Sequence, residues 1–175
     1  RTYGGTLGDG PGGPGAIDFV TNAFVRFTID GIPSIIHWVN KTQNTPVSPY
    51  DTPAKAATNI QDAVNVSADG HSVFIFDNYA SYRPAVIPGL RNFILRASNA
   101  YFPKINALGT SNGISVNGGS NIVIGRIAVS NAAKAGFQMG SLKNSRVTNV
   151  RAVNARSAGV RVDSSTAIRL DRVDA

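Results

Sequence analysis

Three consecutive segments decide the fold: GISVNGGSNIVIGRIAVSNAAKA (113–135), GFQMGSLKNSRVTNVRAVNARSA (136–158) and GVRVDSSTAIRLDRVDA (159–175). They align without a gap at a spacing of 23 residues, and each begins with a glycine. Apolar residues then fall into four columns: Ile114, Phe137 and Val160; Val116, Met139 and Val162; Ile124, Val147 and Leu170; Ile127, Val150 and Val173. A repeat of roughly 20–25 residues with short strands and Gly or Asn turns is typical of a β-solenoid, whose rungs bury one another. The repeat therefore predicts an all-β protein of stacked rungs, with Asn131 and Asn154 stacked at one corner.

The sequence upstream of the repeat predicts two more strands and one helix. SVFIF (72–76) and NFILRA (92–97) are apolar runs of strand length. Thr52 suits an N-cap and Pro53 suits the first helical position. The residues that follow at helical spacing, and that would form one apolar face, are Ala56, Ala57, Ile60, Ala63 and Val64.

The N-terminal segment differs in composition from the rest. Residues 1–16 are rich in Gly and Pro, which predicts a flexible arm. Asp30-Gly31 lies between the apolar runs 24–29 and 35–39, and an Asp-Gly pair in this setting predicts a β-hairpin. We therefore divide the chain into an arm (1–16), a hairpin with a following loop (17–50), and a helix with the solenoid rungs (51–175).

The stretch HWVNKTQNTPVSPYDTPAKAATNIQDAVNVSADGHSVFIFDNYASY (37–82) resembles the N-terminal entry of right-handed parallel β-helix proteins of the pectate-lyase-like superfamily. It is especially similar to large secreted β-helix proteins of environmental bacteria such as Verrucomicrobia. The matching positions are Trp38-Val39-Asn40, Pro46 to Tyr50, Ala56 to Val64, and Gly70 with Val73, whereas His71 replaces an Asp that is usual in these proteins.

The resemblance implies a right-handed parallel β-helix, an extracellular or cell-surface location, and a short helix that caps the first rung through Ala56, Ile60 and Val64. It does not fix an activity, because the superfamily includes lyases, hydrolases, epimerases, adhesins and phage tailspikes.

The charge distribution suggests an anionic partner. Residues 91–175 hold 12 Lys and Arg against 3 Asp, whereas residues 1–90 hold 5 against 7. In the 23-residue register, Arg146 stacks on Arg169, and Arg126 lies in the same column as Arg172, two rungs away. These four arginines form a candidate face for an acidic polysaccharide. Nucleic acid is a less suitable partner, because the basic half lacks a set of aromatic side chains for base stacking.

Catalytic, metal and cofactor sites are not predicted. Every acidic residue is Asp, and none falls between Asp77 and Asp163, so the middle rungs lack the paired carboxylates that glycosidases use. The same gap removes the oxygen ligands of a Ca²⁺ site, although a calcium-free lyase site with an Arg or Lys base stays open. His37 and His71 are distant in sequence, and we read them as two ordinary histidines. The chain has no Cys, and no run of 18 apolar residues that would span a membrane.

Two functions fit these features. The favoured one is a non-catalytic extracellular surface or structural protein that assembles head to tail into a filament. Its last rung would supply the assembly edge, through Val160, Val162, Ile168, Leu170 and Val173, and the N-terminal arm or hairpin of a neighbour would pair with that edge. The alternative is the N-terminal part of a polysaccharide lyase or glycosidase whose catalytic rungs lie beyond residue 175.

Overall fold

A computed structural model describes residues 28–29, 32–33, 35–77, 81–98, 101–109 and 112–175. The chain divides into two units, Arg1–Ser34 and Ile35–Ala175. In the first unit, β1 (Thr28–Ile29) pairs antiparallel with β2 (Ile32–Pro33) on either side of residues 30–31, as a hairpin requires. The predicted arm (1–16), the apolar residues 24–27 and the Asp30-Gly31 turn itself lie outside the described residues.

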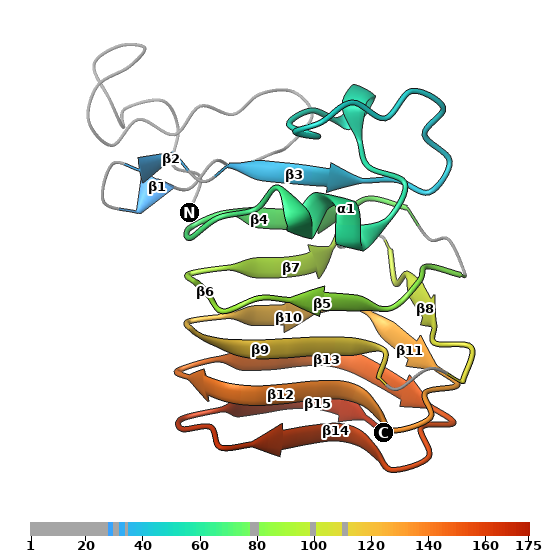
Figure 1. Ribbon diagram of the computed structural model, residues 1–175, viewed down its shortest axis with the longest axis vertical. Coiled ribbons are helices and arrows are strands. Elements are labelled where there is room, and N and C mark those ends of the chain that lie inside the picture. Colours follow the sequence, from blue (N-terminus) through green and yellow to red (C-terminus); the bar gives the residue numbers. More distant parts are fainter. Residues whose placement is uncertain (1–27, 30–31, 34, 78–80, 99–100, 110–111) are drawn as a thin grey trace, which may run out of the picture. The chain divides into compact units, whose positions relative to one another are not determined.

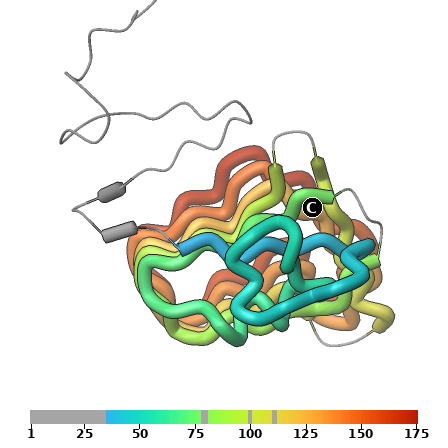
Figure 2. Tube along the Cα trace, turned by 90° about the horizontal axis from the view of Figure 1, so that it is seen from above, coloured from blue at the N-terminus to red at the C-terminus, as the bar shows by residue number. Residues whose placement is uncertain are grey.

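The second unit is a parallel β-solenoid, as the repeat predicts (Figure 1). Seen along its long axis, successive rungs lie one over another (Figure 2). One wall stacks the strands β3 (Ile36–Val39), β4 (Ser72–Ile75), β7 (Ile94–Ala97), β10 (Val123–Gly125), β13 (Arg146–Val153) and β15 (Arg169–Asp174). The chain bends within β13, so that its second half pairs with β11 (Ala128–Ser130), which in turn pairs with β8 (Lys104–Asn106).

The opposite wall stacks β5 (Ala85–Ile87), β9 (Ile114–Ser120), β12 (Ala135–Lys143) and β14 (Ala158–Asp163), and β6 (Leu90–Arg91) pairs with the second half of β9. The strands predicted at 72–76 and 92–97 are present as β4 and β7. One expected strand lies elsewhere: the run 35–39 does not return to the hairpin, because Ile36–Val39 pairs in parallel with Ser72–Ile75 and forms the first rung as β3.

The predicted columns are the observed register. Ile114, Phe137 and Val160 are paired neighbours, and so are the two sets that begin at Val116 and Ile124. Upstream of residue 113 the period changes, because Ser72 pairs with Ile36, Ile94 with Ser72, and Val123 with Ile94. Inward-facing residues of every rung form one continuous apolar core that no single rung could bury by itself.

Each rung turns its corners with residues in the left-handed backbone region. One corner uses Asn131 and Asn154, and another uses Asn121 and Asn144, all with φ between 47° and 58°. Asparagine tolerates this conformation better than most residues. The side chains also bond from rung to rung: the Asn154 amide donates to Asn131 over 3.4 Å, Asn131 to Asn106 over 3.1 Å, and Asn121 to Asn92 over 2.9 Å.

The N-terminal end of the solenoid is covered by residues 40–65. The predicted single helix is divided into a 3₁₀ turn, η1 (Pro53–Lys55), and a short helix, α1 (Ile60–Asn65). The division occurs because Ala57 is extended and bridges to Val39 at the outer edge of β3. The expected apolar face is nevertheless buried, with Ala56, Ala57, Ile60, Ala63 and Val64 all inaccessible to solvent and α1 packed on β3, β4 and β5.

The repeated glycines are required by the close approach of two walls. A Cβ atom on Gly136 would lie 2.7 Å from the carbonyl oxygen of Gly159 and 2.8 Å from the Cβ of Ala152. A Cβ on Gly113 would collide with Val129, and one on Gly159 with Ala175, so the same contact recurs in each repeat. Along the 23-residue glycine column, a Cβ atom would therefore collide with a neighbouring segment of the chain.

We therefore predict that Gly136→Ala destabilises the solenoid by about 1–3 kcal/mol, because the added methyl overpacks a site that cannot expand. The matched control is Gly140→Ala in the same strand, where a Cβ would meet nothing closer than the Val116 oxygen at 3.7 Å. Urea unfolding of both variants measures the difference. Equal midpoints for the two variants would contradict the packing role of the glycine column.

Candidate functional site

The structure gathers three of the four candidate anion-binding arginines around one carboxylate. Arg146 and Arg169 open β13 and β15 and are paired neighbours in the sheet. Asp171 lies 2.5 Å from a terminal nitrogen of the Arg146 guanidinium, and this contact lowers the pKa of Asp171, with the charges of Arg172 and Arg169 acting in the same direction. The three arginines thus form a basic surface, and the Asp171 carboxylate offsets part of its positive charge.

The fourth arginine lies further along the same column. Arg126 and Arg172 both occupy the same corner position of their rungs, with φ values of 57° and 51°, and Asn149 fills that position between them. The Nε of Arg126 donates to the carbonyl oxygen of Ser98 over 3.2 Å. Arg126 thus ties its corner to the preceding rung.

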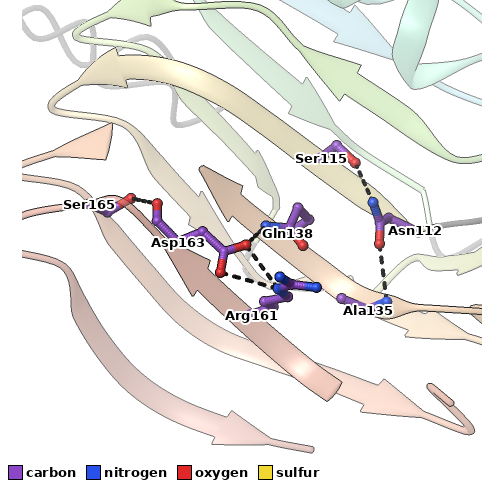
Figure 3. Close-up of polar contacts among 7 residues, drawn as sticks. All are labelled: Asn112, Ser115, Ala135, Gln138, Arg161, Asp163 and Ser165. Atoms are coloured by element: carbon purple, nitrogen blue, oxygen red, sulfur yellow. Dashed lines mark hydrogen bonds and ion pairs between the residues drawn. The ribbon is translucent and has the colours of Figure 1, made fainter. Parts of the chain in front are cut away.

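The other aspartates of the last rung are also held by arginines. Asp163 in β14 accepts from Gln138 over 2.6 Å and lies 2.9 Å from Arg161 (Figure 3). The hydrogen bond from Gln138 is the main cause that lowers the pKa of Asp163, followed by that from Arg161. Asp174 lies 3.0 Å from Nε of Arg151 on the preceding rung.

Polar contacts also link successive rungs further along the same wall. The Asn112 side chain donates to Ser115 over 3.2 Å and accepts from the backbone N–H of Ala135 over 3.1 Å, as Figure 3 shows. The Asn112 side chain thus connects Ser115 of β9 with the first backbone N–H of β12.

The candidate assembly edge is the most exposed part of the apolar columns. Val162 is 39% exposed and Leu170 is 48% exposed, whereas Met139 and Val147, their neighbours one rung earlier, are fully buried. Val160, Ile168 and Val173 are partly buried and pack against the core from the same rung. The inward side chains of β14 and β15 thus form an apolar surface at the C-terminal end of the solenoid.

Sequence reasoning missed a pair of histidines. His37 is on the inward column of β3 and is 1% exposed. Its Nε2 lies 2.9 Å from Nδ1 of His71, and its Nδ1 lies 2.6 Å from the carbonyl oxygen of Pro49. Burial is the main cause that lowers the pKa of His71, and the neighbouring His37 adds to it, while Asp69 acts in the opposite direction. The contact between the two rings follows from the pairing of β3 with β4, which the sequence separation of 34 residues does not indicate.

A second buried polar cluster fixes the start of the loop after β3. The Tyr82 hydroxyl is buried and donates to the carboxylate of Asp77 over 2.6 Å, and the backbone N–H of Lys41 donates to the same oxygen over 2.5 Å. Burial raises the pKa of Tyr82, and the hydrogen bond to Asp77 raises it further. The Asp77 carboxylate thus connects Lys41 of the loop with Tyr82 of the solenoid.

Other kinds of site are not evident in the described part of the chain. Within it, no three side chains of His, Cys, Asp or Glu gather where a metal ion could bind. Among the described helices, none is long and apolar enough to cross a membrane.

No protein-family model, no curated protein and no solved structure matches this chain. The parallel β-solenoid therefore rests on the sequence repeat and on the strand register described above. The resemblance of residues 37–82 to pectate-lyase-like proteins receives no support from these comparisons.

The Asp77 cluster yields a stability prediction. Tyr82→Phe should cost about 1–3 kcal/mol, because the half-buried Asp77 carboxylate loses the hydrogen bond that the buried Tyr82 hydroxyl donates. Tyr101→Phe is the control, since this partly buried tyrosine packs on the same core, and we expect it to stay within about 0.5 kcal/mol of the unmodified chain. Chemical unfolding compares the two. A Tyr82→Phe variant as stable as the control would show that the hydroxyl contributes nothing.

Proposed function

We propose that this chain is a non-catalytic, extracellular β-solenoid of the pectate-lyase-like type that serves as a surface or structural protein and associates head to tail. The observation that carries the proposal is the exposed apolar rung formed by β14 and β15. Its Leu170 and Val162 continue columns that are fully buried one rung earlier. An exposed strand edge with apolar side chains is a template for a further strand.

The arrangement of the carboxylates supports a non-catalytic role. Glycoside hydrolysis needs one carboxyl that protonates the leaving group and another that acts as base or nucleophile. The sequence has no carboxylate from residue 78 to residue 162. The three that follow, Asp163, Asp171 and Asp174, are each ion-paired with an arginine. For Asp163 and Asp171 these contacts lower the pKa and favour the charged form, which suits a structural carboxylate better than a proton donor.

The basic surface supports a secondary role in binding acidic polysaccharide. Arg146, Arg169 and Arg172 lie close together near the C-terminal end, and Arg126 extends the basic column toward the N-terminus. An anionic chain would compete with Asp171 for Arg146. Binding of this kind is electrostatic and would weaken as salt is added.

The two ends of the solenoid differ in how they can join. At the C-terminal end the apolar rung is exposed, whereas at the N-terminal end the outer edge of β3 is already hydrogen-bonded to residues of the loop. Head-to-tail contact therefore needs either a strand supplied by the N-terminal unit of a neighbour or an opening of this loop. Such a contact is heterologous and leads to open-ended growth.

The proposal predicts that the 175-residue chain associates increasingly as its concentration rises, and that Leu170→Lys abolishes this association, because a charge replaces an apolar contact at the edge. Val86→Lys is a matched control: Val86 is 49% exposed, about as much as Leu170, but lies on the outer surface of β5. Light scattering measures the mass of each. A chain that stays monomeric at every concentration contradicts head-to-tail assembly and favours the alternative, in which further rungs of a longer polysaccharide-active protein cover this edge.

A further inference from the structure

The outer edge of β3 is hydrogen-bonded to the backbone of a loop, much as it would be to a further strand. The backbone N–H of Trp38 donates to Tyr50 over 2.8 Å, that of Asn40 donates to Ala57 over 2.9 Å, and that of Ala57 donates to Trp38 over 2.9 Å. These are three of the hydrogen bonds that a preceding rung would otherwise make with a parallel strand. We call residues 40–57 the cap loop, since their removal would leave β3 as an open edge.

The two histidines connect the cap loop to the first rung. A carbonyl oxygen can only accept, so Nδ1 of His37 carries a hydrogen and donates to Pro49, a residue of the cap loop. In the neutral pair, Nε2 of His37 is then an acceptor, and Nδ1 of His71 donates to it over 2.9 Å. The inner ring, His37, thus has both nitrogens engaged while it is almost fully buried.

This arrangement limits how many protons the pair can hold. One added proton is compatible with the contact, because either ring can then donate across the 2.9 Å gap. A second proton places two N–H groups opposite each other and two positive charges in a largely buried position. The charged or titratable groups that act on His71 are the His37 ring and Asp69, whose carboxylate favours the charged form of His71.

The structure places a second titratable attachment at the other end of the cap loop. Asp77 accepts from the Lys41 N–H, and from the Tyr82 hydroxyl. A test of the histidines must therefore separate their effect from that of Asp77.

We propose that the His37–His71 pair is a proton-operated latch, which keeps the cap loop on β3 at neutral pH and releases it when both rings are protonated, so that β3 becomes an edge for a strand of a second copy of this chain. The identity of the docking strand rests on the proposed head-to-tail function. The exposed rung of β14 and β15 in the second copy supplies a parallel strand with apolar inward residues. Docking at β3 then continues the solenoid from one molecule into the next.

The direction of the pH effect follows from burial. A folded state that disfavours charged His71 keeps its full stability above the ordinary histidine pKa of about 6.5 and loses stability as the pH falls below that value. Release is therefore expected on the acidic side only. Asp69 opposes the effect of burial by favouring charged His71 in the latched state, so its removal should move release to higher pH.

Trp38 is the natural reporter for this event. It is the only tryptophan in the chain, it is buried, and its N–H is bonded to the cap loop. We expect its fluorescence to shift to longer wavelength between pH 7 and about pH 4.5, while far-ultraviolet circular dichroism retains the β signal. Amide hydrogen exchange of Trp38, Asn40 and Ala57 should rise over the same range.

Three variants test which residue causes the pH-dependent change in the Trp38 signal. His71→Gln keeps a side chain that can donate to or accept from His37 but cannot be protonated, so the midpoint should move to lower pH by about one unit or more. Asp69→Asn, which keeps the acceptor for the Arg91 N–H but removes the charge that favours protonated His71, should raise the midpoint. In an Asp77→Asn background, which weakens the other attachment of the cap loop, His71→Gln should still move the midpoint to lower pH. A midpoint that follows Asp77 and ignores His71, or a Trp38 signal constant over the whole range, overturns the latch.

Light scattering on the same samples separates the latch from the docking. Growth of assemblies that accompanies the Trp38 transition, and is lost in Leu170→Lys, supports both. A Trp38 transition without any growth in mass keeps the latch and contradicts head-to-tail docking at β3. Growth at neutral pH with Trp38 still buried keeps assembly but contradicts the role of the latch.

Discussion

The structure depends on the stacking of rungs that cannot bury their own apolar side chains. From residue 113 onward, inward residues of one rung are covered by those 23 positions away in the next, and the hydrogen bonds of each strand run to the strands above and below. Stability in such a protein is close to a sum of contacts between neighbouring rungs. Within residues 35–175, the first and last rungs each lack one such neighbour.

The two ends meet this constraint differently. At the N-terminal end, the cap loop satisfies the edge of β3, and α1 covers the apolar interior. At the C-terminal end, Leu170 and Val162 are exposed. Two arginine–aspartate ion pairs connect the last rung to the rung before it, and a third lies within the last rung. The proposed assembly rests on this difference between the first and last rungs.

The rungs from residue 113 onward could be predicted because their 23-residue repeat is evident in the amino-acid sequence. Phe137 falls between Ile114 and Val160 in the structure as in the alignment, and Asn131 bonds to Asn154 at the expected corner. Upstream, loops of different length separate the rungs, so no fixed period links Ile36, Ser72, Ile94 and Val123. For the same reason, the contact between His37 and His71 could not be predicted from the sequence. The helix was expected whole because its apolar spacing is helical, but pairing of Ala57 with the edge of β3 outweighs the local preference.

Amide hydrogen exchange, followed strand by strand in a dilute solution of the chain, tests the dependence on stacking most directly. If rungs are protected by their neighbours, amides of β14 and β15 exchange faster than those of β12 and β13, and their protection rises as the protein is concentrated. Protection in β14 and β15 that equals that of β12 and β13 at every concentration would contradict the account.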